Sequence, residues 1–477
     1  MSSSIKKNLM YNILLQVVTL LIPLVTVPYV SRVLGKDGVG TCSYTLSIVQ
    51  YFIIIGTLGI SMYGNRAIAY VRDDKEKMSK TFWSITALKA ITSSIALIVY
   101  ILIFGFDKKY GTIFLIQSIN IIANIIDISW LYMGLEDFKK TVTRNLAVKI
   151  ICVICIFIFV KGYSDLYLYV IINATMVLFG NIVMWAYVPK VVSKVKIKFV
   201  DIKEHFAPAL QLFIPQIAIQ IYAVLDKTML GSMTTVGEVG LYEQSQKIVK
   251  LVLSLVTSLG VVMLPRMSNT FANGDIKKMD EYLNRSLRGV AYVSIPMTIG
   301  LASISNEFVP WFFGEEFSAV SYLMIILSPI LFLIAMSNVL GTQYLLPSNR
   351  TKEFTASVTC GAIINVLLNL VLIPKYKAIG SCISTVVAEF TVTAIQYFCL
   401  KKNINKKEFF KGVIKYIVAG SIMFIIVRIV GSIMGIGMIT TMIQGIIGVI
   451  IYISVLILFK EDMNRIVVNN IRDKIKR

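Results

Sequence analysis

The sequence predicts an all-α polytopic membrane protein with about 14 transmembrane helices, and three observations carry that prediction. The mean hydropathy is +0.76 and apolar residues make up 56% of the chain, well above the share in a soluble domain. Apolar segments of about twenty residues recur from end to end, and each is long enough to cross a bilayer. Apolar and polar residues do not alternate with a period of two, so an outer-membrane barrel is not expected.

The predicted spans follow one another with short connections, and no extracytoplasmic domain is expected between them. The basic start of the chain is not followed by a short apolar core with a small-residue cleavage site, so the first span is interpreted as uncleaved. The fourteen spans are predicted near 10–33, 39–62, 82–105, 112–134, 146–161, 165–187, 208–231, 239–264, 288–310, 318–344, 354–373, 378–400, 412–431 and 436–459.

The net charge of +21 is interpreted as a topology signal, because the basic residues lie between the apolar segments. Alternate connections are basic: one side carries about 34 Lys and Arg residues and the other about 7. Such a bias places the basic side in the cytoplasm, and an even number of spans leaves both termini there. No nucleic-acid partner is expected.

Cysteine and histidine give no sign of a metal site or a disulfide framework. The six cysteines lie within or beside apolar segments, and the pair Cys152 and Cys155 falls inside an uninterrupted span. We interpret Cys152 and Cys155 as small residues of the membrane core. The single histidine, His205, stands in a basic connection without a second histidine nearby, so neither a metal ligand set nor a cofactor is predicted.

The longest basic connection, VPKVVSKVKIKFVDIKEHF, divides the chain into two lobes that carry a faint internal repeat. Each lobe opens with a proline-broken span, followed by Leu-Gly and then by Gly-x-x-Gly or Gly-x-Gly ahead of the next span. Both halves run the same way through the membrane, which is the parallel repeat of many transporters. The predicted domains are an N-terminal lobe at 1–195, a C-terminal lobe at 196–402, two additional spans within 403–459 and an amphipathic basic cytoplasmic tail at 460–477.

The hairpin formed by the seventh and eighth spans carries charged residues at membrane depth. Along the eighth span Glu243, Lys247, Lys250, Ser254 and Thr257 follow steps of four, three, four and three, which places them on one helix face. Two interpretations stay open: the face lines a polar, partly cationic cavity, or the charges only pair with each other and reach to the headgroups. The cavity is favoured, because the stripe continues inward beyond the reach of a lysine chain.

Other spans carry polar stripes as well. In the fourth span Gln117, Asn120, Asn124 and Asp127 share a face, and Lys89 in the third span is expected to pair with Asp127 at matching depth. Buried Asn and Gln can also join helices by hydrogen bonds, and we prefer that interpretation for the asparagines of the sixth and eleventh spans. Arg428, near the outer end of the thirteenth span, is expected to extend to the headgroups.

The candidate site residues are therefore cavity-lining polar and charged side chains, with no catalytic residue among them. The substrate-binding candidates are Lys247, Lys250, Lys227, Arg32, Lys89, Gln216, Gln220, Asn120, Asn124 and Ser254. An H⁺ or Na⁺ gradient would need an acidic residue, and the ion-coupling candidates are Asp127, Asp226, Glu243 and Glu389.

Several stretches together resemble the polysaccharide-transporter (oligosaccharide flippase, Wzx-like) family of the multidrug/oligosaccharidyl-lipid/polysaccharide exporter superfamily. They include LGKDGVGTCSY, YGNRAIAYVRDDKEK, LDKTMLG with VGLYEQSQKIV, VVMLPRMSNTFANGD, FFGEEFSAVSYLMIILSPILF, VLGTQYLLPSNRTKEF and INVLLNLVLIPKYKAIGSCISTVVAEF. The resemblance covers nearly the whole chain. It implies two six-helix lobes in a V plus two C-terminal helices, with spans one, two, seven and eight lining a central cavity.

The resemblance also implies a function: moving isoprenoid-diphosphate-linked oligosaccharide from the inner to the outer leaflet of the bacterial cytoplasmic membrane by alternating access, for cell-surface polysaccharide export. Fixed Lys or Arg would offset the desolvation of a diphosphate, and amides and hydroxyls would bind sugar hydroxyls. Membrane lipids and other polysaccharide-assembly membrane proteins are the further partners expected. Two alternatives are a multidrug exporter of the same superfamily and a membrane polymerase or glycosyltransferase, which the short outer loops disfavour.

Overall fold

The computed structural model describes the backbone of residues 3–261, 263–461 and 463–464. Within those ranges it does not describe the side chains of residues 3–17, 19–20, 214–216, 218–219, 221–223 and 258–261. The chain separates into two compact units, Met1–Gly231 and Ser232–Arg477. The predicted boundaries after 195, 402 and 459 follow the order of spans and the sequence repeat, and they stay predictions. Most of the predicted tail helix at 460–477 lies outside the described residues.

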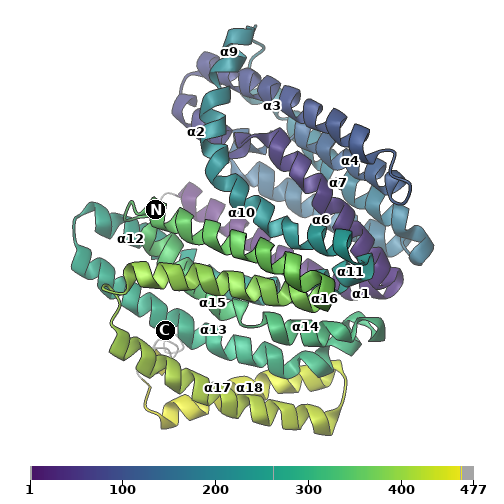
Figure 1. Cartoon of the computed structure of the whole chain (residues 1–477). Coiled ribbons are helices and arrows are strands. Elements are labelled where there is room, and N and C mark those ends of the chain that lie inside the picture. Colours follow the sequence, from purple (N-terminus) through teal and green to yellow (C-terminus); the bar gives the residue numbers. More distant parts are fainter. Residues whose placement is uncertain (1–2, 262, 462, 465–477) are drawn as a thin grey trace. The chain divides into compact units, whose positions relative to one another are not determined.

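The regular structure of the first unit is helical, as expected from its apolar segments (Figure 1). Helix α4 packs against both α3 and α7, and α6 packs against α7. The helices are α1 (Ser3–Thr57), α2 (Ile60–Val71), α3 (Lys75–Phe104), α4 (Gly111–Ile125), α5 (Ser129–Gly134), α6 (Phe138–Phe159), α7 (Leu166–Trp185), α8 (Val188–Val191), α9 (Phe199–Glu204) and α10 (Phe206–Met233), with the short helix η1 at Tyr163–Asp165.

The second unit is built in the same way, and α13 is the helix that packs against both α17 and α18 (Figure 1). Its helices are α11 (Val236–Val261), α12 (Met263–Ala272), α13 (Ile276–Phe313), α14 (Ala319–Leu327), α15 (Ile330–Ser337), α16 (Thr351–Leu400), α17 (Lys406–Met434) and α18 (Met438–Leu458). Two short elements complete the unit, η2 at Glu315–Phe317 and η3 at Asn338–Leu345.

Each of the fourteen predicted spans falls on helical structure, and two long helices each contain two of them. Helix α1 breaks at Gly35 (φ 64°, ψ 179°) and α16 breaks at Lys377 (φ 50°, ψ −129°). Gly35 suits its position, because a residue without a Cβ adopts positive φ at little cost. Ten stretches of the described residues are long and apolar enough to cross a membrane, and two of these, Leu21–Val71 and Thr351–Leu400, hold two predicted spans each.

Several predicted spans differ from the helices observed, and the ninth, predicted from 288, belongs to α13, which already starts at Ile276. The fourth, 112–134, is interrupted between α4 and α5, and the tenth, 318–344, is divided among α14, α15 and the π-helical η3. The fifth was predicted to start at 146, but α6 starts at Phe138, so Arg144 belongs to the helix and not to a connection. Hydropathy placed residues 138–145 in a connection because several of them are charged, whereas the backbone hydrogen bonds of α6 continue through them.

Both units turn many large apolar side chains outward. Examples are Ile98 and Leu102 on α3, both 58% exposed or more, and Ile425 on α17 at 59%. The interior holds aromatic and aliphatic side chains together with buried polar groups such as Lys89 and Asn365. Apolar outer faces around a partly polar interior are what a bilayer requires of a helical membrane protein.

Within the first unit, contacts join connections that the charge pattern places on the same side of the membrane. Arg72 pairs with Glu136 at 2.9 Å, which links the connections after the second and fourth predicted spans. In the second unit Asn405 N donates to Asn284 Oδ1 at 2.7 Å, linking the connections after the eighth and twelfth. These contacts are consistent with the alternation of basic and non-basic connections in each unit.

Candidate functional site

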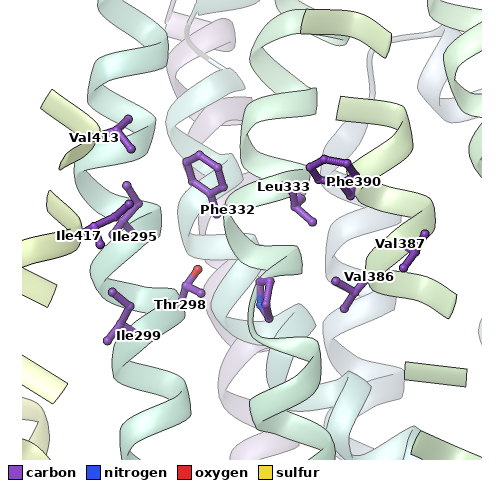
Figure 2. A pocket seen from close by; sticks show the side chains of 11 residues that line it. Ile295, Thr298, Ile299, Phe332, Leu333, Val386, Val387, Phe390, Val413 and Ile417 are labelled. Atoms are coloured by element: carbon purple, nitrogen blue, oxygen red, sulfur yellow. The ribbon is translucent and has the colours of Figure 1, made fainter. Parts of the chain in front are cut away.

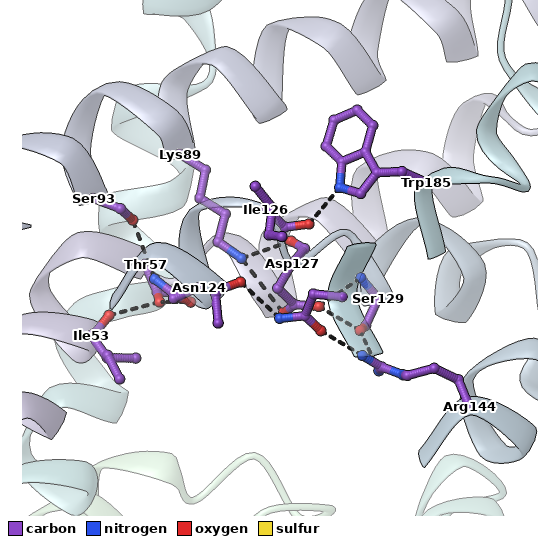
Figure 3. Close-up of polar contacts among 12 residues, drawn as sticks. Ile53, Thr57, Lys89, Ser93, Asn124, Ile126, Asp127, Ser129, Arg144 and Trp185 are labelled. Atoms are coloured by element: carbon purple, nitrogen blue, oxygen red, sulfur yellow. Dashed lines mark hydrogen bonds and ion pairs between the residues drawn. The ribbon is translucent and has the colours of Figure 1, made fainter. Parts of the chain in front are cut away.

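A buried ion pair lies at the break between α4 and α5 in the first unit (Figure 3). Lys89 on α3 is 1% exposed, and its Nζ lies 3.5 Å from Asp127 Oδ2. The same Nζ donates to the Asp127 backbone carbonyl at 2.8 Å. The expected Lys89–Asp127 pair is therefore confirmed as a contact. Because the helix break frees the Asp127 carbonyl from helical hydrogen bonding, one ammonium satisfies both the carboxylate and the backbone.

A second cation, Arg144 of α6, belongs to the same cluster. Its Nη2 donates to Ser129 Oγ at 3.0 Å and its Nη1 donates to Asn181 Oδ1 at 2.5 Å. Ser129 in turn donates through its backbone N (3.0 Å) and its hydroxyl (2.5 Å) to Asp127 Oδ1. Sequence reasoning assigned Arg144 to a cytoplasmic connection and missed this role. A carboxylate between two cations is far more stable at membrane depth than an isolated one.

The fourth-span asparagines are also hydrogen-bonded within the first unit, and Figure 3 shows Asn124. Asn124 donates to Ser93 Oγ at 3.2 Å and accepts from Thr57 Oγ1 at 3.1 Å, so it joins α4 to α3 and α1. Asn120 donates to Gln117 Oε1 at 2.7 Å on its own helix. Asn181 donates to the Ala123 carbonyl at 2.7 Å, which confirms the predicted helix-joining role of that residue.

The charged end of α10 packs against the second half of α1. The Thr228 hydroxyl lies 2.9 Å from Ser47 Oγ and accepts from Tyr51 Oη at 3.1 Å. Next to it, Asp226 is buried at 7% exposure and Lys227 is half-buried. Two further candidates, Gln220 on α10 and Arg32 on α1, are exposed. The side chain of the remaining α10 candidate, Gln216, lies outside the described residues.

The charged stripe of α11 is present in the second unit, with one ion pair inside it. Lys247 Nζ lies 3.6 Å from Glu243 Oε1, and the side chains are 36% and 14% exposed. One turn further on, Lys250 is exposed. The Ser254 hydroxyl donates to the Leu251 carbonyl of its own helix at 2.6 Å. The fourth acidic candidate, Glu389, is half-buried on α16.

A second ion pair, between a buried carboxylate and a half-buried arginine, lies in the second unit and was not predicted. Arg428 Nη1 of α17 lies 3.2 Å and 3.3 Å from the two carboxylate oxygens of Glu307 on α13. Gln444 of α18 donates to Glu307 Oε2 at 3.3 Å, so three helices meet at one carboxylate. The pairing of Arg428 was not expected, and the extension of its side chain to the headgroups stays a prediction. Opposite charges near the outer ends of the ninth and thirteenth spans were the signal that could have revealed the pair.

The second unit also contains an apolar cavity of about 440 Å³ between α13, α15, α16 and α17 (Figure 2). Its lining includes Ile295, Phe332, Leu333 and Phe390, and Thr298 contributes the one hydroxyl among the residues that Figure 2 labels. Such a lining suits hydrocarbon and offers almost nothing to sugar hydroxyls or phosphate. The polar candidates on α11 are not among the residues that line it.

Two family models match the chain. The model described as "Polysaccharide biosynthesis protein" matches residues 5–271, and the model "Lipid II flippase MurJ" matches residues 144–456. A protein of Escherichia coli K12 designated an O-antigen transporter is 25% identical over 84% of this chain and 97% of its own length. The capsular polysaccharide biosynthesis protein CapF of Staphylococcus aureus is 22% identical over 83% of this chain and 99% of its own.

Solved structures show the same fold at low sequence identity. The lipid II flippase MurJ in an inward closed conformation gives a TM-score of 0.77 at 18% identity, covering 94% of this chain and 99% of its own. An inward-facing multidrug resistance MATE family transporter of the MOP superfamily gives 0.58 at 12% identity, covering 80% and 94%. The all-helical multi-pass architecture is thus shared with both kinds of transporter.

Proposed function

Because this chain belongs to the polysaccharide biosynthesis protein family, a family of membrane transporters and not of enzymes, we propose that it is a flippase for lipid-diphosphate-linked oligosaccharide. It moves the substrate from the inner to the outer leaflet of the bacterial cytoplasmic membrane, by alternating access, for cell-surface polysaccharide export. Both termini lie in the cytoplasm in this proposal, as the basic connections indicate.

The observation that carries the proposal is the charged stripe of α11. Lys250 is exposed and the Lys247 side chain is more than one-third exposed, both in a predicted span. A cation at membrane depth is stable only where an anion or water contacts it. A diphosphate carries dense negative charge and must leave the headgroup zone during transfer. Leaving that zone removes water from the diphosphate, and ammonium groups fixed on a helix offset the free-energy cost of this desolvation. The Glu243 carboxylate holds Lys247 in place while no substrate is bound.

The geometry divides the remaining candidates into two groups. Lys89, Asn124 and Asp127 have their hydrogen-bonding groups directed to protein partners, and we assign them a structural role in the first unit. Arg32, Lys227, Gln220 and Gln216 stay proposed substrate contacts. Asn120 and Ser254, which bond within their own helices, stay proposed contacts as well. Among the acids, Asp226, Glu243 and Glu389 stay proposed for coupling to H⁺ or Na⁺, whereas Asp127 is already neutralised by cations of the chain.

The test is a transfer assay with the purified full-length chain in lipid vesicles. A lipid-diphosphate oligosaccharide is placed in the outer leaflet, and its accessibility to an impermeant sugar-modifying enzyme is followed together with its mass. The proposal predicts that the substrate changes leaflet with unchanged mass. A polymerised or hydrolysed product, or transfer of cationic drugs without transfer of the lipid, would overturn it in favour of the two alternative functions.

A further inference from the structure

The connection between α7 and α10, residues 188–206, is fixed to the end of the first unit. The Ser193 backbone N donates to Ser79 Oγ at 3.0 Å. Trp83 Nε1 of α3 donates to the Ser193 carbonyl at 3.0 Å. These two bonds hold an extended stretch, which has no regular backbone partners of its own, against the start of α3. We call residues 188–206 the connector.

The second half of the connector is held by charge and by its histidine. Lys80 Nζ lies 2.8 Å from Asp201 Oδ1, and this ammonium lowers the pKa of the Asp201 carboxyl. Asp201 Oδ2 also accepts from the Lys198 backbone N at 2.9 Å, which starts α9. The His205 Nδ1 lies 2.6 Å from the Tyr63 hydroxyl of α2. One side of the connector is therefore committed to α2 and α3.

The other side is basic and apolar. Phe199 is 73% exposed and Val200 is 63% exposed at the start of α9. The connector has two acidic residues, and one of them, Asp201, is already paired with Lys80. Its lysines are all exposed, and they are Lys190, Lys194, Lys196, Lys198 and Lys203.

The depth of the connector follows from the tryptophans that it contacts. Trp83 in the third turn of α3 and Trp185 at the end of α7 lie with ring centroids 6.2 Å apart. Tryptophan is enriched at the membrane–water interface, where an apolar ring and a polar N–H are both accommodated. Ser193 is bonded to Trp83 itself, and Lys80 stands about one turn outward from that residue. The connector thus lies at the level of the lipid headgroups, and Figure 1 shows α9 at this end of the first unit, near α2 and α3.

We propose that the exposed face of the connector binds anionic phospholipid headgroups of the cytoplasmic leaflet. Lys194, Lys196 and Lys198 contact the lipid phosphates, and Phe199 and Val200 enter the interfacial zone. Juxtamembrane lysines are attracted to an anionic surface, and exposed aromatic residues add apolar burial there. A protein partner is a poorer fit, because clustered lysines are depleted from the core of protein interfaces.

Neighbouring acidic residues do not cancel this charge. Asp74 accepts from the backbone N of Glu76 and Lys77 and pairs with the Lys77 ammonium at 3.3 Å, so its charge is used locally. Asp73 and Glu76 are exposed in the same turn with Lys75 between them, while Arg72 pairs with Glu136. The net charge of this end of the unit stays positive.

The test compares the full-length chain in nanodiscs of phosphatidylcholine alone with nanodiscs that also contain phosphatidylglycerol. Hydrogen–deuterium exchange is measured at residues 194–200. Exchange should be slower in the anionic discs, by about fivefold for each lysine engaged. The difference should shrink as the salt concentration rises, because exposed charges are screened. Equal exchange in the two kinds of disc would overturn the proposal.

Two sets of variants separate lipid binding from a general charge effect. The triple variant Lys194→Gln/Lys196→Gln/Lys198→Gln should lose the protection by anionic lipid, and the corresponding triple Arg variant should keep it. The matched control, Lys401→Gln/Lys402→Gln/Lys406→Gln, removes the same charge from exposed positions of the second unit and should leave the connector unchanged. An equal loss in that control, or protection by RNA or acidic peptide in place of the lipid, would contradict the proposal.

Discussion

Lys89 Nζ and Asp127 Oδ2 lie 3.5 Å apart inside the first unit, at the point where α4 stops and α5 begins. The pair closes a helix break: the Lys89 ammonium donates to the Asp127 carbonyl and places a positive charge beside the carboxylate, which also accepts from Ser129. Arg144 approaches the same carboxylate through Ser129. Helices α3, α4, α5 and α6 are thereby joined at one place, which gives the pair a structural consequence that can be measured.

Removing the ammonium should destabilise the first unit strongly. Deleting one partner of a buried pair costs about 3–5 kcal/mol when the remaining charge is fully buried. Asp127 is 26% exposed and keeps its hydrogen bonds to Ser129, so we expect a loss near the lower end of that range. We expect Lys89→Met to lower the apparent melting temperature of the detergent-solubilised chain, and Lys89→Met/Asp127→Asn to recover part of the loss. Lys77→Met removes a lysine that is 75% exposed beside Asp74 and should change little. Equal effects of Lys89→Met and Lys77→Met would refute the structural role.

The glycine at the Glu307–Arg428 pair should tolerate no side chain. A Cβ at Gly431 would lie 2.4 Å from Gln444 Nε2 and 2.7 Å from Glu307 Cδ, whereas a Cβ at Gly445 would meet nothing within 4 Å. Gly431→Ala should therefore cost about 1–3 kcal/mol by overpacking. Gly445→Ala should be neutral or gain up to about 1 kcal/mol from helix propensity. Thermal unfolding of the two variants checks the difference, and the prediction fails if Gly431→Ala is as stable as Gly445→Ala.

The contact between His205 and Tyr63 should weaken in acid. Burial lowers the pKa of His205 below its usual value of about 6.5, so the folded state favours the neutral ring, which can accept from the Tyr63 hydroxyl. The stability from this contact is complete above about pH 6.5 and is lost as the pH falls through the folded pKa.

His205 is the chain's only histidine, which makes its titration simple to observe. One set of imidazole NMR signals should titrate with a midpoint below 6.5, the usual pKa of histidine. The apparent melting temperature should fall between pH 7 and pH 5 by less in His205→Gln than in the native chain. A midpoint at or above 6.5 would show that burial does not determine the pKa of the His205 ring.

The topology can be read from two engineered cysteines in a variant without the native six. Lys277 lies exposed in the first turn of α13, next to the connection after α12, and Thr235 lies exposed in the turn between α10 and α11. In intact cells, impermeant thiol reagents should label Thr235→Cys and leave Lys277→Cys unmodified. The reverse labelling would contradict the arrangement with both termini in the cytoplasm.

The cations of α11 can be tested for contact with substrate. If Lys247 and Lys250 meet the lipid diphosphate, Lys247→Ala and Lys250→Ala should impair transfer at near-normal expression, and Arg at either position should retain part of the activity. If Lys247 serves only to pair with Glu243, then Glu243→Gln/Lys247→Gln should transfer normally, because neither charge is left unpaired. Normal transfer by that double variant would remove Lys247 from the substrate site.

The sequence by itself determined the class of protein and the positions of its helices. Hydropathy over a span and the 3.6-residue period are local properties, so the fourteen segments and the breaks near Gly35 and Lys377 were readable from residue order alone. The Lys89–Asp127 contact was readable too, because two opposite charges at equal depth in adjacent spans have a strong energetic reason to meet.

Only the tertiary structure decided which helix faces meet. Arg144 bonds to Asn181, 37 residues away, and Arg428 bonds to Glu307, 121 residues away. Such contacts depend on the rotation and tilt of each helix about its axis, which a periodic pattern leaves free when both neighbours and lipid are apolar. The docking of Asp201 on Lys80 is of the same kind. A charge pattern predicts that a connection is basic, whereas packing decides which of its residues are already paired and which are left to face the membrane.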